Sequence, residues 1–161
     1  MTDKTSAPKD ADKAPNKSPR RRAREYAVQG LYQFQLTGDS VGTIERFLRD
    51  SSTAFNRADE GLFREIFYGA MNAREDLMYR IEPCLDRSVD EVSPVEKAIL
   101  QVAAFELLNK PETPYAVIIN EAIELAKTFG GTDGHRFVNG VLDKLAVEVR
   151  AAEVAQGRKR K

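Results

Sequence analysis

The stretch SPVEKAILQVAAF, residues 93–105, decides the fold class of this chain. Serine at a helix N-cap, proline at the first helical position and glutamate three residues after the serine form a capping-box pattern. The run that follows, from Ala98 to Phe105, is apolar nearly all round, and such a helix has to be covered on most sides. We therefore predict a central helix from Pro94 onward, with other helices packed around it.

Apolar residues spaced three and four apart predict three helices before this central one. The first begins near Arg20 and ends at Gly38-Asp39-Ser40, and Ser40 can cap a short second helix. Asp59 can cap a long third helix, which we expect to run on until Pro83. The expected core faces carry Ala23, Ala27, Gly30, Leu31 and Phe34, then Ile44, Phe47 and Leu48, then Leu62, Ile66, Gly69, Ala73 and Leu77.

Two more helices are predicted after the central one. Thr113-Pro114 opens a helix that Gly130-Gly131 ends, and Thr132-Asp133 opens the last helix. No alternating strand pattern is present, so the fold class is all-α, with one helical domain over residues 20–151. The flanking segments 1–19 and 152–161 are poor in large apolar residues, and we expect a disordered N-terminal extension and a basic C-terminal tail.

Composition limits the classes of protein to consider. A chain of 161 residues with 42% apolar residues fits one globular domain. No apolar run approaches the ~20 residues of a membrane span, and no apolar segment follows the basic residues at the N-terminus as in a secretory signal. The single cysteine, Cys84, cannot form an intramolecular disulfide. We expect a cytoplasmic protein with no membrane contact.

The net charge of zero conceals an uneven distribution of charge. Residues 1–24 carry eight Lys and Arg against three Asp, and residues 158–161 are all basic, so the body between them has a net charge of −9. An acidic body with basic ends indicates a localised phosphate contact and a separate surface for another partner.

Reactive groups are too sparse to predict an enzyme. Glu121 and Glu124 share a helix face, but no His follows at the spacing of a carboxylate metal site, so a solvated or ion-paired face is the simpler interpretation. Cys84 is interpreted as a small apolar residue, and a Cys84–His135 dyad as a remote alternative. We predict no catalytic residue, no metal and no cofactor.

An arginine cluster is the first candidate binding feature. Arg20, Arg21, Arg22 and Arg24 lie where the polar extension becomes a helix, and guanidinium groups grip phosphates with a planar fork. The cluster indicates an RNA-binding arm, with a solubilising tail as the alternative. Tyr32 lies on a face of the same helix away from its core stripe, and an exposed aromatic ring there suits base stacking.

The start of the last helix is the second candidate. Free backbone N–H groups, the helix dipole and Arg136 would attract an anion, whereas Asp133 is expected to cap the helix. A capped helix start without a ligand is therefore the alternative. Phe137 fits a core position by its pattern alone.

Three stretches of this sequence resemble the NusB family. The first is RRRARE with AVQGLY, residues 20–25 and 27–32, and the second is VEKAIL, residues 95–100. The longest is PYAVIINEAIELAK, residues 114–127, which continues through Phe129-Gly130 to HRFVNGVLDK, residues 135–144. The similarity covers roughly Arg20 to Val149, and between Gly38 and Val92 it is one of pattern only.

The resemblance implies a fold, a function and partners. It implies two small helical subdomains packed across each other, and a transcription antitermination factor that binds the boxA RNA of ribosomal RNA operons. The implied partners are the small-subunit ribosomal protein NusE, other Nus factors and RNA polymerase. A helical protein-interaction scaffold without RNA function is the alternative. RNA contacts are implied for the residues Arg20, Arg21, Arg22, Arg24, Tyr32 and Phe137, with Asp133 beside them, and a NusE contact for Glu96 and Lys97. Arg136 is added to the RNA contacts from its place at the start of the last helix.

Overall fold

The computed structural model describes residues 17–159, with side chains up to residue 157. Every regular element in this range is helical, as predicted. The α-helices are α2 (Pro19–Thr37), α3 (Val41–Ser51), α4 (Glu60–Asn72), α5 (Arg74–Ile81), α6 (Pro94–Asn109), α7 (Tyr115–Phe129), α8 (Gly134–Val149) and α9 (Ala151–Lys159). Short 3₁₀ turns, η1 (Phe55–Arg57), η2 (Glu82–Cys84) and η3 (Val89–Glu91), lie in the connections.

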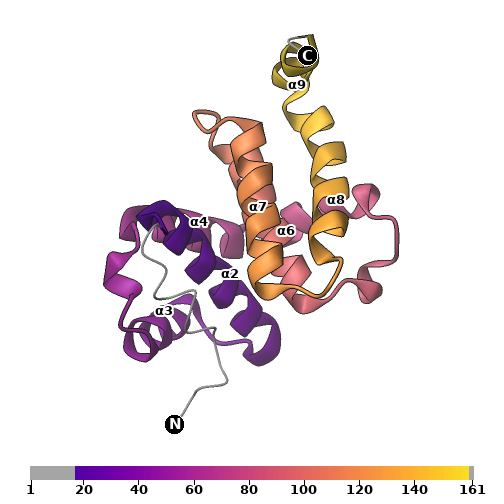
Figure 1. Ribbon diagram of the computed structural model, residues 1–161. Helices are drawn as coiled ribbons and strands as arrows, with labels where there is room; N and C mark the ends of the chain where they lie inside the picture. Colours follow the sequence, from indigo (N-terminus) through magenta and orange to yellow (C-terminus); the bar gives the residue numbers. More distant parts are fainter. Residues whose placement is uncertain (1–16, 160–161) are drawn as a thin grey trace.

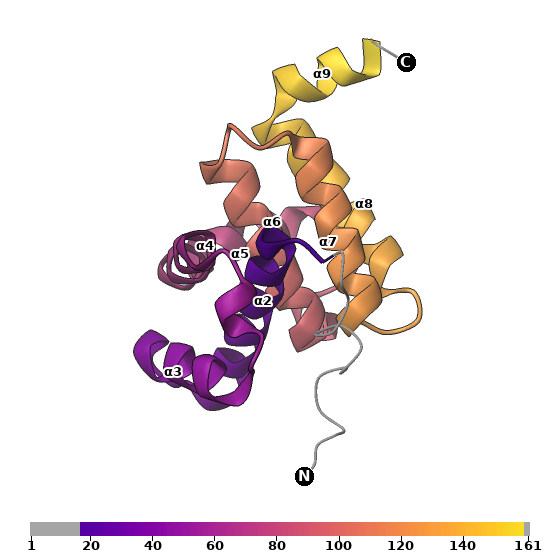
Figure 2. The same cartoon turned by 60° about the vertical axis from the view of Figure 1, so that its left-hand side comes forward.

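The helices form two groups packed across each other, which confirms the predicted fold class (Figure 1). Helices α2, α3 and α4 make the first group, and α5 to α9 make the second. Helix α6 contacts α2, α4, α5, α7 and α8, so it is the central helix that its sequence predicts (Figure 2). Its apolar residues are buried on all sides, for example Ile99, Leu100 and Ala104 at 0% exposure. The core of the protein is therefore built around α6.

Glycines let the helices approach closely at two crossings. A Cβ atom on Gly30 of α2 would lie 2.6 Å from the ring of Phe67 on α4. A Cβ atom on Gly69 of α4 would lie 2.3 Å from the ring of Phe105 on α6. Both aromatic rings are buried, so a methyl group at either glycine would displace packed side chains. These two glycines set the spacing of α2, α4 and α6.

Most predicted helix starts are confirmed. The side chains of Ser40, Asp59 and Ser93 accept backbone N–H groups at the starts of α3, α4 and α6. The full capping box predicted at Ser93 is wrong, since the carboxylate of Glu96 lies beside Gly134 of α8 instead. The third predicted helix is also interrupted: α4 ends at Asn72, and Arg74 Nη1 donates to the carbonyl of Met71 at 2.7 Å.

Both ends of the domain are more ordered than the sequence indicates. At the N-terminal end, Ser18 caps α2, so helix begins at Pro19; residues 1–16 of the predicted extension lie outside the described range. At the C-terminal end, residues 152–159 of the predicted tail belong to α9, whose Val154 is buried. Glu153 accepts the backbone N–H of Tyr115 at 2.8 Å, which satisfies the start of α7 where Pro114 offers no side-chain cap. A contact between distant segments therefore holds α9 in place.

Candidate RNA and partner surfaces

Two arginines of the predicted cluster are accessible. The side chain of Arg20 is 49% exposed and lies 3.8 Å from Asp59. The side chain of Arg21 is 37% exposed and forms a paired hydrogen bond with Glu121 of α7, at 3.0 Å from Nε and 2.9 Å from Nη2. Hydrogen bonding to Glu121 raises the pKa of Arg21, so the guanidinium is charged at every relevant pH. Both arginines can reach a ligand at the start of α2.

The other two arginines of the cluster are buried, which corrects the prediction of four phosphate contacts. Arg24 donates from Nε and Nη2 to Glu106 of α6 at 2.7 and 2.9 Å, and the two side chains are 5% and 1% exposed. Burial lowers the pKa of Arg24, but the hydrogen bonds and charge of Glu106 outweigh it and raise the pKa overall. Arg22 is 5% exposed. Arg24 therefore joins α2 to α6, and Arg22 and Arg24 are both buried in this structure.

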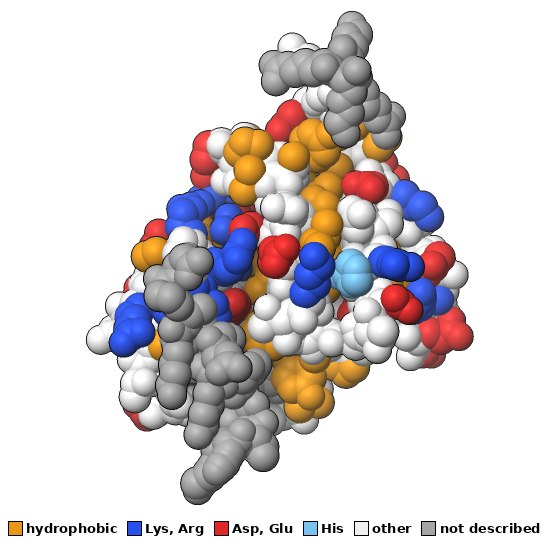
Figure 3. All heavy atoms as spheres, in the orientation of Figure 1, with side chains coloured by type: hydrophobic (Ala, Val, Ile, Leu, Met, Phe, Trp, Pro, Cys, Tyr) orange, Lys and Arg blue, Asp and Glu red, His pale blue; other side chains and the backbone are white. Residues whose placement is uncertain are grey.

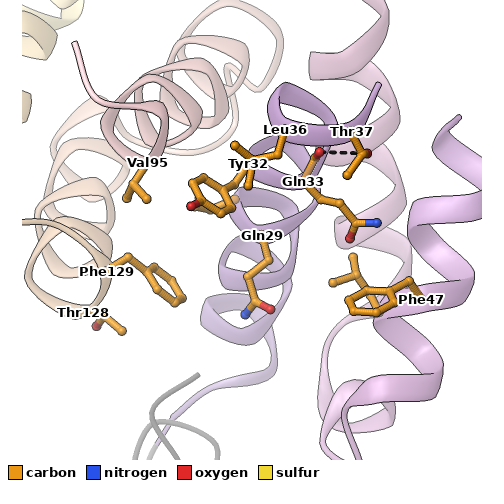
Figure 4. A pocket seen from close by; sticks show the side chains of 11 residues that line it. Gln29, Tyr32, Gln33, Leu36, Thr37, Phe47, Val95, Thr128 and Phe129 are labelled. Atoms are coloured by element: carbon orange, nitrogen blue, oxygen red, sulfur yellow. Dashed lines mark hydrogen bonds between the residues drawn. The ribbon is translucent and has the colours of Figure 1, made fainter. Parts of the chain in front are cut away.

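Tyr32 lies on the accessible face that its position on α2 predicts. It is 36% exposed and borders a groove of about 690 Å³ between α2, α3 and the adjoining ends of α6 and α7. In Figure 4 the ring of Tyr32 projects from α2 toward Val95, the ring of Phe129 lies on the α7 side of the groove, and Gln29 extends from α2. The groove combines aromatic faces with side-chain amides, a combination that accepts flat, polar rings.

Most residues that line this groove were not predicted from the sequence to form a binding surface. Phe47 was expected on a core face, yet it is 54% exposed, and Phe129 at the end of α7 is partly exposed. Helical periodicity identifies an apolar stripe, but it does not show which end of the stripe extends past its neighbouring helix. The position of Phe129, directly before the glycines that end α7, was the only signal available.

The start of α8 corrects the predicted role of Asp133. Asp133 occupies the N-cap position, but its side chain makes no capping hydrogen bond and the residue is exposed. Arg136 is exposed as well. The view in Figure 3 shows basic side chains on either side of the single histidine. The side chains of Asp133 and Arg136 are therefore open to solvent, and no capping bond fixes the carboxylate of Asp133.

Phe137 is packed in the core, and its contact with RNA stays a prediction. It is 9% exposed and packs within the hydrophobic core. The guanidinium of Arg87 lies 4.0 Å from the centroid of its ring, in a cation–π arrangement. Arg87 also donates to Asp86 at 2.8 Å, which raises the pKa of Arg87. Arg87 therefore covers one face of the Phe137 ring.

Glu96 and Lys97, the predicted partner contacts, are half-buried at the start of α6. Lys97 borders a second groove, of about 650 Å³, between α2, α5 and α6. Tyr79 of α5, which is 81% exposed, lies at the same groove. Glu96 points instead toward Gly134, where an added Cβ would lie 2.8 Å from its carboxylate oxygen. The two neighbouring residues therefore face different surroundings.

Reactive chemistry is sparse in the part of the chain that the structure describes. It contains no group of three His, Cys, Asp or Glu residues that could hold a metal ion. Cys84 is buried, and burial raises the pKa of its thiol. Glu121 is ion-paired with Arg21, as the simpler interpretation of this residue expects. No helix among the described residues is long and apolar enough to span a membrane.

These features define an all-helical protein with an arginine-bearing helix face beside an aromatic groove. Its sequence matches the NusB family over residues 21–147, and the chain belongs to this family. The family is non-enzymatic, so the chain is not an enzyme.

Individual relatives agree with this assignment. The transcription antitermination protein NusB of Chromobacterium violaceum is 58% identical over 147 residues, covering 90% of this chain and 98% of that protein. The protein of the same name from Ralstonia nicotianae is 53% identical over 146 residues, covering 91% and 94%. The solved structure of T. maritima NusB is 30% identical with a TM-score of 0.71, covering 82% and 93%. A crystal structure of the antitermination factors NusB and NusE with dsRNA shares the fold, at 23% identity and a TM-score of 0.68, covering 79% and 95%.

Proposed function

We propose that this chain is a cytoplasmic RNA-binding transcription antitermination factor. It recognises boxA-type single-stranded RNA of ribosomal RNA operons together with NusE, and acts with other Nus factors on RNA polymerase. Support comes from the antitermination proteins that share more than half of its residues over nearly their whole length. A related NusB has been crystallised with NusE and RNA.

One geometric observation carries the RNA-binding part of the proposal. Arg21 and Tyr32 lie on the same face of α2, within about 20° of each other around the helix axis and about 16 Å apart along it. This face of α2 borders α7, and the side chain of Tyr32 lines the aromatic groove. A strand of RNA laid along α2 would place phosphates at Arg20 and Arg21 and a base at Tyr32. An electrophoretic shift with boxA-like RNA against a scrambled strand tests this, and a scaffold without RNA function would shift neither.

The second groove suits the protein partner better than the first. The exposed Tyr79 lines this groove, and so do residues of positive and negative charge, namely Lys97, Arg74 and Glu75. Aromatic residues with a polar rim are typical of protein interfaces. We assign the NusE contact to this side of α6, with Lys97 facing the groove and Glu96 one residue away.

Replacing Tyr32 by alanine should weaken binding of boxA-like RNA by ~1–3 kcal/mol, because a stacking surface for one base is lost. Tyr32→Phe should bind almost as wild type, since stacking needs the ring and not the hydroxyl. The measurement is a fluorescence titration of the three proteins, with thermal melts in the same buffer. A Tyr32→Ala protein that melts early but binds normally would remove Tyr32 from the RNA surface.

Neutralising Asp133 should strengthen RNA binding. Its exposed carboxylate stands close in sequence to the exposed Arg136 at the start of α8, so Asp133→Asn removes a repulsion of phosphate, and the gain should shrink as salt rises. Because the side chain makes no capping bond, even Asp133→Ala should melt within a few degrees of wild type. Paired RNA titrations and melts give both results. If Asp133→Asn binds no more tightly at preserved stability, the start of α8 does not face the RNA.

A further inference from the structure

The ion pair between Arg21 and Glu121 holds an arginine in place on the proposed RNA face. Glu121 is 17% exposed and lies in the middle of α7, opposite the first turn of α2. Its two carboxylate oxygens each accept one N–H of the guanidinium, at 3.0 and 2.9 Å. Such a two-point contact fixes both the position and the plane of the group. The side chain of Arg21 is thus ordered before any ligand arrives.

The same contact leaves part of the guanidinium available. A guanidinium has five N–H donors, and Glu121 engages only those on Nε and one on Nη2. The remaining donors on Nη1 and Nη2 have no other partner among the residues that the structure describes. They form the outer edge of the fork, and the side chain is 37% exposed. This edge has the geometry for two parallel hydrogen bonds to a phosphate.

A role in holding the subdomains together does not explain this pair. Arg24, on the next turn of α2, already joins α2 to the second group of helices through the buried carboxylate of Glu106. The Arg21–Glu121 pair is partly hydrated, and exposed pairs contribute little to folding.

We infer that Glu121 is a positioning residue for RNA, which holds Arg21 so that its outer edge receives a backbone phosphate. This role rests on the proposed function and adds a residue to it. The expected change in RNA affinity is opposite in sign to the one that simple electrostatics predicts, because a carboxylate near RNA would otherwise only repel it. Losing Glu121 should weaken binding even though the protein becomes less negative.

The test compares Glu121→Gln with Glu124→Gln, a matched control. Glu124 lies about one turn further along α7 and carries the same charge, but its carboxylate approaches Lys127 at 3.8 Å, whereas the hydrogen bonds of Arg21 go to Glu121. Affinity for a boxA-like oligonucleotide is measured for both variants at 100 mM salt. Glu121→Gln should lose about two- to tenfold, the factor expected when one long side chain must be ordered on binding. Glu124→Gln should bind as wild type or slightly more tightly.

A double variant separates positioning from a general effect on the fold. In an Arg21→Ala background, Glu121→Gln should no longer weaken binding, because the side chain it positions is gone. If Glu121→Gln weakens binding equally in both backgrounds, or strengthens binding as Glu124→Gln does, the positioning role is wrong while RNA binding stands. If the wild-type protein binds neither boxA-like nor scrambled RNA, the proposed function fails and this role fails with it.

Discussion

Glu106→Ala is expected to destabilise the protein by ~3–5 kcal/mol, the largest loss that any charged residue of this chain should show. The change leaves Arg24, 5% exposed and held against α6, without the carboxylate that accepts two of its N–H groups. An arginine guanidinium is not deprotonated at neutral pH even without a partner, so the charge remains buried and loses its two hydrogen bonds to Glu106. Urea unfolding followed by circular dichroism measures the effect.

A compensated variant distinguishes the buried charge from lost packing. Arg24→Met combined with Glu106→Leu removes both charges and keeps apolar volume, and it should recover most of the stability. RNA affinity should also survive in this double variant, because neither residue is accessible. If Glu106→Ala lowered the free energy of unfolding by less than ~1 kcal/mol, the ion pair would be hydrated in solution. Arg24 would then be a candidate for RNA contact again.

Replacing Arg20, Arg21 and Arg136 together by alanine should abolish most of the electrostatic part of RNA binding. Three phosphate contacts with single-stranded RNA give a log–log salt slope of about −2.1. Losing these contacts should lower the affinity for RNA by roughly 500-fold at 50 mM salt and by about 30-fold at 200 mM salt. Each factor is the electrostatic gain in affinity over the value extrapolated to ~1 M salt. Titrations across this salt range measure the affinity and the slope together. Helicity should be unchanged, because all three side chains are exposed or partly exposed.

The matched control removes three arginines elsewhere. Arg46, Arg57 and Arg80 are exposed on α3, η1 and α5, and their replacement changes the net charge equally. This control should keep a slope close to that of wild type. Equal losses in both triple variants would mean that RNA responds to overall charge and not to the face formed by α2 and the start of α8.

The sequence predicted the helical framework well because local chemistry determines it. Ser93-Pro94 begins α6 as expected, and the apolar run after it is the central helix. Ser40 and Asp59 cap the helices they were expected to cap, since an N-cap needs only a side-chain oxygen and three following residues. Tyr32 was placed on the correct face because helical spacing separates it from Leu31 and Ala27.

The candidate site was less predictable because it depends on residues far apart in the chain. Four arginines in five positions look alike in sequence, but Arg24 meets Glu106, 82 residues later, and Arg21 meets Glu121, 100 residues later. The guanidinium of Arg24 is therefore buried against Glu106, whereas that of Arg21 is held by Glu121 at an accessible position. Phe137 is likewise covered by Arg87, from a connection whose path no local pattern indicates.

The most direct test of the central claim is the affinity of the full-length protein for RNA with and without NusE. A labelled boxA-like oligonucleotide and a scrambled strand of equal composition are titrated with the protein alone and with an equimolar mixture of the two proteins. We predict that the protein alone prefers boxA-like RNA, and that NusE increases this affinity, because the proposed RNA groove and the proposed partner groove are lined by different residues and can be occupied together. Equal affinity for both strands, unaltered by NusE, would contradict the account.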